Sequence, residues 1–586
     1  MTYTPRYTNL VQLFTTAVER FGTRPLFGTR RPAGWHWTTY SQFSELVNQA
    51  RAGLAALGIG PGDRVAVISN NRLEWVVCAF GTFTRAAVYV PMYEAQLDRD
   101  WQYILRDSAA KVCLVASPAI AGRVRALQPE LPDLRHVIDF QDVSYTDLLA
   151  RGAAHPVAAT QPADRDCAMY IYTSGTTGNP KGVELTHYNL ASNASGVLEV
   201  APLATNEQER SLAFLPWAHV FGGCVEINAL MGHGDALAIC DNTDKLIDYL
   251  PEVQPTVLFA VPRIWNRIYD SVQKQIAGRP KLIQDLFHAA MRAKAKQRNQ
   301  QPLGRRERLK LAIAEKLIFE KVRARFGGRL RFAFSGAAAL SRDVAEFIDN
   351  LGILVYEGYG LTESSGCTTA SAPDRRLGAV GKPIPGVQIE IDKSAVGANG
   401  DEGEIIIMGS GVMARYHNQI EETRGAFTPS GGLRTGDLGR IDADGFLYIT
   451  GRVKEIYKLS NGKYVAPTPI EEKLQLSPYI AQCFLFGADK PHNVALIVPD
   501  MQALASWASS GGIDQATLLT DPRTRELLRR EIDAQSREIK GYEAVRDFVL
   551  EAEPFSTQND MLTPTLKLKR RNVMKRFGEK LEALYK

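Results

Sequence analysis

The sequence lacks the features of a disulfide-stapled or membrane-spanning protein. Its 586 residues include only seven cysteines, an odd number, and no two of them form a Cys-x-x-Cys pair. This spacing argues against a disulfide framework and a zinc site, and it suits a reducing compartment. No uninterrupted apolar run reaches the roughly eighteen residues of a membrane-spanning helix. The first ten residues contain no apolar core of a secretory signal, so we expect a cytoplasmic location.

Positive charge, in contrast, is concentrated in one segment. Residues 274–331 contain 17 Lys or Arg and 4 Asp or Glu, a local balance of +13, whereas the whole chain carries +5. Apolar residues at helical spacing predict helices around residues 282–290 and 309–322. The first interpretation is a solvated insertion of two helices at about residues 270–330. One alternative is a basic surface that contacts anionic lipid headgroups at the inner face of a membrane. A nucleic-acid site ranks last, because no recognition motif accompanies the charge.

Helical and strand-like segments alternate through the first half of the chain. Tyr40–Leu57 and Glu74–Ala86 have helical patterns, and the apolar runs Arg64–Ser69 and Ala87–Val90 are typical of buried strands. This alternation predicts layered α/β subdomains with parallel strands. Between Gly378 and Gly451, short strands separated by Gly and Asp turns predict a β-rich subdomain.

The last part of the chain, after Gly451, has strands and helices of its own, enough for a separate small α+β domain. The expected fold class is therefore α/β, with a large layered N-terminal region and a small C-terminal domain. We place the two domains at residues 1–451 and 452–586.

The strongest chemical signal is a loop of small residues, Tyr172-Thr173-Ser174-Gly175-Thr176-Thr177-Gly178-Asn179-Pro180-Lys181-Gly182, which follows a predicted strand. Glycines let backbone N–H groups approach phosphate oxygens, hydroxyls add donors, and Lys181 adds positive charge. The spacing differs from that of a Walker A loop, so a P-loop NTPase is a poor fit. The pattern predicts a polyphosphate-binding loop rather than an ordinary surface turn.

This loop resembles the signature loop of the adenylate-forming superfamily, which includes acyl- and aryl-CoA ligases, nonribosomal adenylation domains and luciferase. Further motifs follow in the family's order, so that the resemblance extends from about Trp37 to Arg570. The stretch Ala260–Arg267, followed by the basic insertion, resembles the long-chain fatty acid–CoA ligase branch in particular. The further motifs are Leu215–Gly222, Ser335–Ala339, Tyr356–Ser364, Arg434–Asp437, Gly451–Glu455 and Leu562–Arg570.

The resemblance implies a role for each motif. His219 lies beside the acyl carboxylate, Thr362 meets the α-phosphate, and Glu363 binds Mg²⁺, a role that one carboxylate can fill together with phosphate oxygens and water. Lys567 bridges the carboxylate and the α-phosphate. The residues implied to bind the polyphosphate of ATP are Thr173, Ser174, Gly175, Thr176, Thr177, Gly178 and Lys181.

The resemblance also implies which residues contact the rest of ATP and CoA. It places Gly336, Ala337 and Ala338 along the adenine face, Glu357 and Gly358 beside the nucleotide, and Tyr359 near the base. It implies that Asp437 accepts hydrogen bonds from the ribose hydroxyls, that Arg452 is the second ribose contact, and that Lys458 lies near the adenylate. Ser460, Asn461 and Gly462 resemble the loop that meets CoA.

The last motif departs from the family's common form, which ends in Gly-Lys. Here Leu566 stands in the place of that Gly, and Lys569 is only two residues beyond Lys567. The long-chain branch often has Leu-Lys or Phe-Lys at this point, so we assign the catalytic role to Lys567. A basic C-terminal tail is the alternative interpretation for Lys569, Arg570 and Arg571.

The resemblance implies an ATP-dependent ligase that forms acyl-AMP and then acyl-CoA, with ATP, Mg²⁺ and coenzyme A as cofactors and a fatty acid as substrate. The C-terminal domain is expected to act as a mobile lid that turns about Lys454. One alternative passes the acyl group to a carrier protein or an amine, and another uses medium-chain or aryl acids. A non-catalytic nucleotide- or lipid-binding protein predicts the loss of Lys181, Glu363, Asp437, Arg452 or Lys567, and all five are present.

Overall fold

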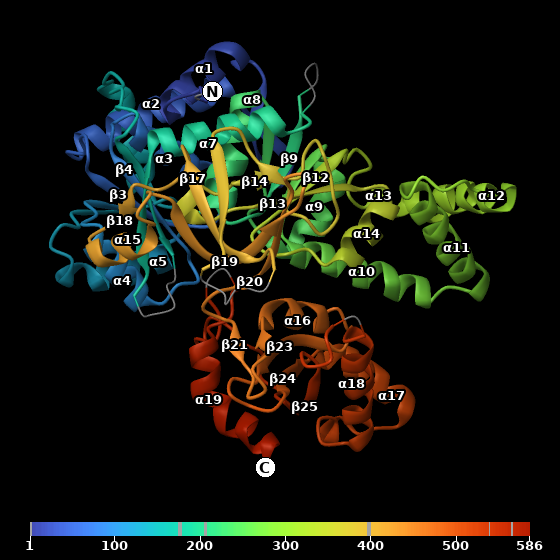
Figure 1. Cartoon of the computed structure of the whole chain (residues 1–586). Helices are drawn as coiled ribbons and strands as arrows, with labels where there is room; N and C mark the ends of the chain where they lie inside the picture. Colours follow the sequence, from blue (N-terminus) through green and yellow to red (C-terminus); the bar gives the residue numbers. More distant parts are fainter. Residues whose placement is uncertain (1–2, 174–178, 204–207, 395–399, 538, 564–565) are drawn as a thin grey trace. The chain divides into compact units, whose positions relative to one another are not determined.

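The computed structural model of the chain describes residues 3–173, 179–203, 208–394, 400–537, 539–563 and 566–586 (Figure 1). The fold is mixed α/β, which confirms the predicted class. The chain divides into two compact units. Unit 1 comprises Met1–Glu390, Ile406–Thr435 and Ala443–Leu447, and unit 2 comprises Ile391–Ile405, Gly436–Asp442 and Tyr448–Lys586. The predicted domain boundary at residues 451 and 452 stays a prediction.

The largest sheet of unit 1 has seven strands in the order β18-β8-β7-β4-β3-β5-β6. Strands β7, β4, β3, β5 and β6 run parallel, as the alternating sequence pattern predicts, and β8 runs antiparallel to β7. The strands are β3 (Arg64–Ile68), β4 (Val88–Met92), β5 (Val112–Val115), β6 (His136–Asp139), β7 (Cys167–Thr173), β8 (Lys181–Thr186) and β18 (Arg415–Tyr416).

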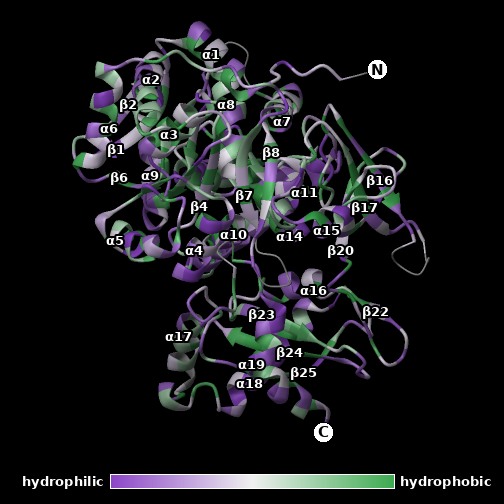
Figure 2. Cartoon of the chain, turned by 90° about the vertical axis from the view of Figure 1, so that its left-hand side faces the viewer, coloured by the Kyte–Doolittle hydropathy of each residue, from purple (hydrophilic) through white to green (hydrophobic). Residues whose placement is uncertain are grey.

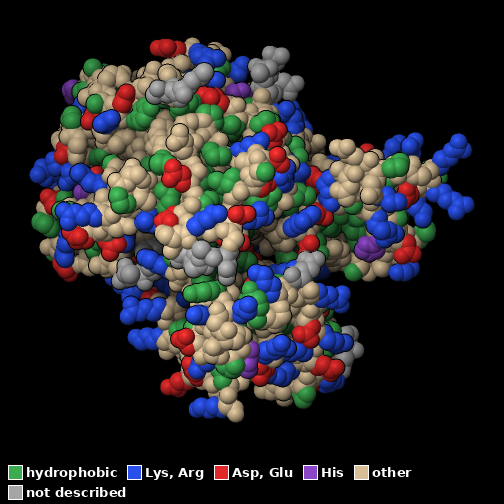
Figure 3. All heavy atoms as spheres, viewed as in Figure 1, with side chains coloured by type: hydrophobic (Ala, Val, Ile, Leu, Met, Phe, Trp, Pro, Cys, Tyr) green, Lys and Arg blue, Asp and Glu red, His purple; other side chains and the backbone are tan. Residues whose placement is uncertain are grey.

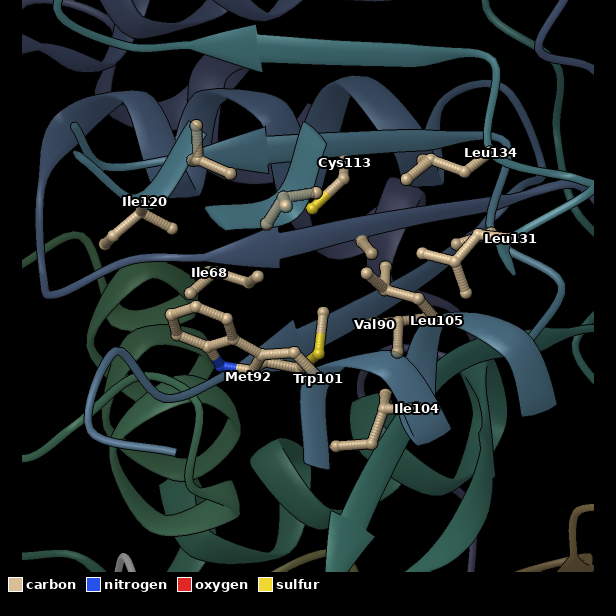
Figure 4. Close-up of a cluster of buried hydrophobic side chains, with 14 of the residues drawn as sticks. Ile68, Val90, Met92, Trp101, Ile104, Leu105, Cys113, Ile120, Leu131 and Leu134 are labelled. Carbon is tan, nitrogen blue, oxygen red and sulfur yellow. The ribbon is translucent and has the colours of Figure 1, made fainter. Parts of the chain in front are cut away.

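One face of this sheet packs on the apolar sides of amphipathic helices. Figure 4 shows Ile68 and Val90 from the strands beside Trp101 and Ile104, and all four side chains are buried. Burial of a large apolar side chain stabilises the fold by about 1.5–3 kcal/mol. The helices of unit 1 outside the basic insertion are α1 (Leu10–Phe21), α2 (Tyr40–Ala56), α3 (Leu73–Phe83), α4 (Asp98–Asp107), α5 (Pro118–Leu127), α6 (Val143–Ala154), α7 (His187–Val200), α8 (Ile227–His233), α9 (Leu246–Val253), α10 (Pro262–Ala277), α14 (Arg342–Asn350) and α15 (Ile420–Ala426).

Local chemistry fixes where these helices begin and how closely they pack. Thr39 caps α2 in a capping box with Gln42, which satisfies backbone N–H groups of the first turn. Helices α2 and α6 approach so closely that a Cβ on Gly152 would lie 1.9 Å from the carbonyl oxygen of Gln49. Only glycine is compatible with this contact.

Two further sheets belong to unit 1. Their strand orders are β2-β1-β10-β9 and β11-β12-β13-β14-β15, and β11, β12 and β13 are parallel. The strands are β1 (Pro25–Arg31), β2 (Gly34–Thr39), β9 (Arg210–Ala213), β10 (Ala236–Ile239), β11 (Val257–Ala260), β12 (Phe332–Ser335), β13 (Leu354–Tyr359), β14 (Thr369–Ala370) and β15 (Lys382–Pro383).

The basic segment is helical, as predicted, but it contains more than two helices. Helices α11 (Lys281–Arg298) and α12 (Arg305–Ala314) are followed by a π-helical turn at Glu315–Phe319 and by α13 (Glu320–Ala324). Figure 1 shows α11 and α12 extending away from the sheets of unit 1. None of the described helices is long and apolar enough to cross a membrane.

A β-rich region follows, as the sequence predicts. Its four-stranded sheet has the order β16-β17-β19-β20, and the division between the two units runs through its strands. The strands are β16 (Val387–Asp392), β17 (Gly403–Gly409), β19 (Leu433–Ile441) and β20 (Leu447–Arg452).

The rest of unit 2 is built around a three-stranded sheet of order β23-β24-β25, with a separate β21-β22 hairpin. The central strand β24 is buried along its whole length and is mostly green in the hydropathy view of Figure 2. The elements are β21 (Tyr457–Lys458), β22 (Tyr464–Val465), β23 (Ile480–Phe486), β24 (Asn493–Pro499), β25 (Val545–Leu550), α16 (Pro467–Leu474), α17 (Met501–Gly511), α18 (Pro522–Gln535) and α19 (Arg570–Glu582).

Candidate active site

The predicted phosphate loop connects two antiparallel strands. Thr173 ends β7 and Lys181 begins β8, and these two residues face each other in the strand register. The loop therefore leaves and re-enters the sheet at one point. The predicted loop residues Ser174, Gly175, Thr176, Thr177 and Gly178 lie outside the described residues.

Lys181 and Glu363 are brought together through Tyr416. The ammonium of Lys181 lies 5.2 Å from the centre of the Tyr416 ring, an arrangement that attracts a cation to the ring face. The hydroxyl of Tyr416 donates a hydrogen bond of 2.8 Å to Oε1 of Glu363. Burial and the neighbouring Glu363 carboxylate raise the pKa of Tyr416 well above its usual value, so the phenol stays protonated and keeps donating.

Strand pairing places Tyr416 at this position. Tyr416 lies on the short strand β18, where it pairs with Val183 of β8, two residues beyond Lys181. Lys181 also forms an ion pair with Glu422 of helix α15, whose side chain is half-exposed. The sequence analysis did not single out Tyr416 or Glu422, because no spacing pattern connects them to Lys181.

Thr362 and Glu363 form a short 3₁₀ turn, Thr362–Ser364. Thr362 is buried, and the backbone carbonyl of Glu363 accepts a hydrogen bond of 2.8 Å from the N–H of Met413. No cluster of three or more acidic, His or Cys side chains suited to a metal occurs among the described residues. Mg²⁺ is commonly held in proteins by one or two carboxylates together with substrate phosphate oxygens and water. Glu363 can supply such a carboxylate, so the site fits the ion.

His219 is held by its own motif. The carbonyl of Pro216 accepts a hydrogen bond of 3.0 Å from the backbone N–H of His219, and Nδ1 of the ring accepts one of 3.2 Å from the N–H of Phe221. The acceptor role of Nδ1 leaves Nε2 as the protonated ring nitrogen. The preceding Trp217 donates its backbone N–H to Oδ1 of Asn71 at 2.9 Å. Asn71, like Tyr416 and Glu422, is a residue that the sequence analysis did not single out.

A π-helical turn at Phe221–Glu226 begins two residues after His219. Such turns are rare and occur frequently at functional sites. A Cβ on Gly223 would lie 2.1 Å from the carbonyl oxygen of Trp217, so the turn packs against the motif in a way that only glycine permits. Phe221 also lies against Gly336, where an added Cβ would be 3.4 Å from the ring. The acyl motif and the predicted adenine loop are therefore neighbours.

The predicted adenine loops follow the parallel strands β12 and β13. Gly336, Ala337 and Ala338 come directly after β12, and Ala337 has a left-handed backbone with φ of 69°. Ligands of α/β folds bind beyond the carboxyl ends of such strands. The position of the loop agrees with a ligand site, and the strained Ala337 is the kind of backbone that functional loops hold.

Glu357, Gly358 and Tyr359 form the last part of β13, where β14 pairs with Gly358 and Tyr359. The backbone of Glu357 exchanges hydrogen bonds of 2.7 and 2.8 Å with the hydroxyl and N–H of Ser371. Burial raises the pKa of the Glu357 carboxyl to about 7, against the opposing effects of two backbone N–H donors and Arg375.

The predicted ribose pair lies in unit 2. Nε of Arg452 is 2.9 Å from Oδ1 of Asp437, and Asp437 is buried whereas Arg452 is half-exposed. The Gly436 N–H, next to Asp437, donates to Oε1 of Glu404 at 3.0 Å. Lys454, the predicted pivot, is exposed two residues after Arg452.

The predicted CoA loop is the exposed tip of the β21-β22 hairpin. Ser460, Asn461 and Gly462 are all exposed, and Gly462 has a φ of 86° that suits glycine. Lys458, the lysine predicted near the adenylate, is exposed just before this loop. The N–H of Gly462 donates to the carbonyl of Leu459 at 2.9 Å, which closes the turn.

The C-terminal motif contains two lysines, Lys567 and Lys569, with different contacts. The N–H of Lys567 donates to the hydroxyl of Thr563 at 3.0 Å. The ammonium of Lys569 pairs with Asp560 at 2.5 Å. Leu566, in the place of the family's glycine, has a left-handed φ of 62° and is half-exposed. The backbone thus keeps the conformation that a glycine would adopt freely.

Contacts among the predicted site residues occur within each of the two units. In unit 1 the structure connects Lys181 with Glu363, and the His219 motif with Gly336. In unit 2 it connects Asp437 with Arg452.

A fold and a site of this kind define an adenylate-forming enzyme, and the sequence comparisons agree. The family model of the AMP-binding enzymes matches residues 14–417, and that of the AMP-binding enzyme C-terminal domain matches residues 454–586. The chain belongs to the AMP-binding enzyme family.

Curated relatives match over nearly the full length. The chain is 34% identical over 578 residues to the long-chain-fatty-acid–CoA ligase FadD15 of Mycobacterium bovis, covering 94% of this chain and 92% of the relative. It is 32% identical over 620 residues to the peroxisomal long chain acyl-CoA synthetase 7 of Arabidopsis thaliana, covering 99% and 87% of the two chains.

Solved structures share the fold. The anthranilate CoA ligase AuaEII, in complex with anthranoyl-AMP, has a TM-score of 0.74 at 21% identity, covering 100% of this chain and 98% of the other. The adenylation domain of a carboxylate reductase from Mycobacterium chelonae has a TM-score of 0.78 at 23% identity, covering 98% and 91%.

Proposed function

We propose that the chain is an ATP-dependent long-chain fatty acid–CoA ligase. The observation that carries the proposal is the connection of Lys181 to Glu363 through Tyr416, at the base of a loop suited to polyphosphate. Near-full-length likeness to curated long-chain-fatty-acid–CoA ligases supports the substrate class. Fatty acid, ATP and CoA are the reactants of this proposal.

In the first half-reaction a carboxylate oxygen attacks the α-phosphorus of ATP. The bond from that phosphorus to the bridging oxygen breaks, and pyrophosphate leaves. Both reactants are anionic, so the barrier is largely electrostatic. Lys181 stabilises the polyphosphate, Lys567 the α-phosphate and carboxylate, and the Thr362 hydroxyl donates to the α-phosphate. His219 orients the carboxylate with its Nε2 proton. The chemistry needs no side-chain nucleophile.

Glu363 would hold Mg²⁺, and the ion when bound supplies positive charge beside the phosphate oxygens. The nucleoside end of ATP is assigned to three groups. The adenine lies along Gly336, Ala337 and Ala338, bordered by Glu357, Gly358 and Tyr359. Asp437 accepts hydrogen bonds from the ribose hydroxyls, since a carboxylate is an acceptor only. Arg452, which pairs with Asp437, is the second ribose contact.

In the second half-reaction the CoA thiol attacks the acyl-AMP carbonyl and AMP leaves. The loop of Ser460, Asn461 and Gly462 is assigned to CoA, and its exposed, hydrogen-bonded turn supports a role in contacting a large ligand. Lys458, just before this loop, is assigned to the adenylate. A rotation about Lys454 between the half-reactions completes the proposal, because Lys567 and the CoA loop serve different steps.

The choice of Lys567 as the catalytic lysine rests on the motif, in which it directly follows Leu566 as in the Leu-Lys form of the long-chain branch. Its backbone N–H donates to the Thr563 hydroxyl, and its carbonyl accepts a hydrogen bond from the Thr563 N–H. Lys569, two residues further on, forms an ion pair with Asp560.

The test is a reaction of the purified protein with ATP, Mg²⁺, CoA and single acids from acetate to oleate, followed by mass spectrometry of AMP and acyl-CoA. The proposal expects AMP and acyl-CoA in equal amounts, most with the longer acids. Acyl-AMP without thioester would favour transfer to a carrier protein or an amine. A maximum with octanoate or benzoate would favour a medium-chain or aryl acid ligase, and no AMP from any acid would contradict adenylation.

A further inference from the structure

Helix α12 and the π-helical turn after it carry apolar side chains on two faces. Leu311, Ala314 and Ile318 are buried. Leu309, Ile313 and Leu317 are 63%, 42% and 49% exposed. The exposed three are spaced by four residues, which places them side by side along one face of a helix. A solvated helix has one apolar face, turned to the core, so the second face is unusual.

Basic side chains surround this second face. Arg305, Arg306, Arg308, Lys310 and Lys316 are all exposed. In the part of the chain that the structure describes, none of their side chains has an ion pair or hydrogen bond with a protein group. Figure 3 shows Lys and Arg side chains gathered on the extended helical insertion, with apolar side chains among them.

Acidic side chains of the same segment form ion pairs with other basic residues of the insertion, so they do not neutralise the five exposed basic residues. Glu307 pairs with Lys296 at 2.6 Å. Glu315 pairs with Lys294 at 3.8 Å and with Arg323. Glu320, exposed at the end of the apolar row, is followed directly by the exposed Lys321. The outer face therefore keeps a net positive charge.

The insertion is a fixed scaffold rather than a loose arm. The ring of Phe287 on α11 lies 6.1 Å from that of Phe319 and 6.2 Å from that of Phe347 on α14. Arg298 at the end of α11 pairs with Glu346 of α14 at 2.9 Å. The exposed face is held in one orientation relative to α14, which reduces the conformational entropy lost on docking.

We infer that this face, defined by Leu309, Ile313 and Leu317 with the five flanking basic residues, docks on an anionic phospholipid bilayer. Leucine and isoleucine enter the boundary between headgroups and acyl chains, and arginine and lysine pair with the lipid phosphates. Interfacial amphipathic helices bind membranes in the same way, with apolar side chains among the lipids and basic side chains at the headgroups. The charge on the face is complementary to an anionic surface, and the apolar row distinguishes it from a purely solvated basic face. The inference is independent of the catalytic proposal.

The experiment is flotation of the full chain with vesicles of phosphatidylcholine alone and of phosphatidylcholine mixed with phosphatidylglycerol. Wild type is expected to float with the anionic vesicles at low salt and to be released at high salt. In the triple variant Arg305→Gln/Arg306→Gln/Lys310→Gln, binding is expected to fall about 100-fold, because each basic residue near an anionic surface contributes about fivefold.

The apolar row is tested by the double variant Leu309→Ser/Ile313→Ser. The matched control is Val143→Ser/Ile247→Ser, which removes two apolar side chains that are 73% and 56% exposed elsewhere in unit 1. The inference expects loss of vesicle binding of about tenfold or more in the first variant and none in the control. Both pairs are exposed, and thermal unfolding checks that both variants fold.

Three results would overturn the inference. One is equal flotation of wild type and the Leu309→Ser/Ile313→Ser variant. A second is equal flotation with both kinds of vesicle. The third is self-association of wild type in light scattering that the double variant abolishes, because a second copy of the chain would then cover this face. Retained catalysis with octanoate in the unbound variants would show that docking and chemistry are separate.

Discussion

The hydroxyl of Tyr416 donates a hydrogen bond of 2.8 Å to Oε1 of Glu363, and the same ring lies 5.2 Å from the Lys181 ammonium. One side chain thus orients a carboxylate and faces a lysine that come from separate motifs. The bond fixes one oxygen of Glu363.

Tyr416→Phe keeps the ring and removes this donor. We expect kcat for AMP formation to fall roughly 10- to 100-fold and the Mg²⁺ requirement to rise, because hydrogen bonds to charged groups contribute about 1.5–3 kcal/mol. The measurement is initial rate against Mg²⁺ concentration. The matched control is Tyr249→Phe, whose hydroxyl donates to Asp241 at 3.2 Å outside the proposed site. If the Mg²⁺ dependence of Tyr416→Phe were the same as that of wild type, Tyr416 would not position Glu363 for the ion.

Glu422 forms an ion pair with Lys181, the lysine proposed to contact the polyphosphate, and is therefore expected to compete with ATP for it. Glu422→Gln removes the carboxylate, and we expect KM for ATP to fall by up to about fivefold, since a partly exposed ion pair is worth at most about 1 kcal/mol. Glu421→Gln, on the same helix but paired with Arg424, is the control and leaves KM unchanged. A higher KM in Glu422→Gln would mean that Glu422 positions Lys181 rather than competing for it.

The two C-terminal lysines give opposite expectations. Lys567→Ala is expected to slow acyl-AMP formation by roughly 100-fold or more, the usual effect of removing one group that stabilises transition-state charge. It should spare the conversion of supplied acyl-AMP to acyl-CoA. Lys569→Ala loses only its pair with Asp560 and should change either step less than about threefold. The comparison is made with single-turnover assays of each half-reaction. If Lys569→Ala, and not Lys567→Ala, slowed acyl-AMP formation, the catalytic lysine would be Lys569.

Leu566 has a left-handed backbone conformation. The stability of variants at this position should therefore depend on how easily the new residue adopts that conformation, rather than on the size of its side chain. Leu566→Gly is expected to leave the melting temperature of the protein unchanged or raised, because a left-handed L-residue costs about 1–2 kcal/mol and the half-exposed side chain contributes little. Leu566→Val should be destabilising, since a β-branched residue is an outlier at this φ. Thermal unfolding of the three proteins gives the order, and a Val variant as stable as Gly would contradict the assigned conformation.

Glu226 makes stability depend on pH. It is fully buried, receives a 2.7 Å hydrogen bond from the Ser211 hydroxyl, and burial raises its pKa to about 8 from an ordinary value of 4.5. A pKa raised in the folded state gives stability that is complete below pH 4.5 and is lost as pH rises through 8. The melting temperature of wild type should therefore fall between pH 5 and pH 8 relative to that of Glu226→Gln. Parallel pH profiles of the two proteins would show that Glu226 is not the group responsible.

The sequence predicted much of the fold because local patterns govern it. The strands at Arg64–Ile68 and Val88–Met92 and the helix between them follow from apolar spacing and turn residues. The loops predicted to contact adenine could be located at the ends of strands because small residues follow apolar runs in the sequence, while their role stays a prediction. Tyr416 could not be found this way. Its contact with Lys181 arises only when β18 pairs with β8, and these strands are separated by more than two hundred residues.

Other features also depend on tertiary context. The row of Leu309, Ile313 and Leu317 has helical spacing in the sequence, which by itself does not say whether the row faces the core. The buried face proved to be Leu311, Ala314 and Ile318. The assigned roles of the site residues, the domain boundary and the rotation about Lys454 stay predictions.

The central claim is that the acid is activated by attack on the α-phosphorus of ATP. The direct test uses a long-chain acid labelled with ¹⁸O in both carboxylate oxygens, incubated with the protein, ATP, Mg²⁺ and CoA. The account predicts one ¹⁸O atom in each AMP, because the bridging oxygen of acyl-AMP comes from the carboxylate and leaves with AMP. Unlabelled AMP, or ¹⁸O in inorganic phosphate together with ADP, would contradict it.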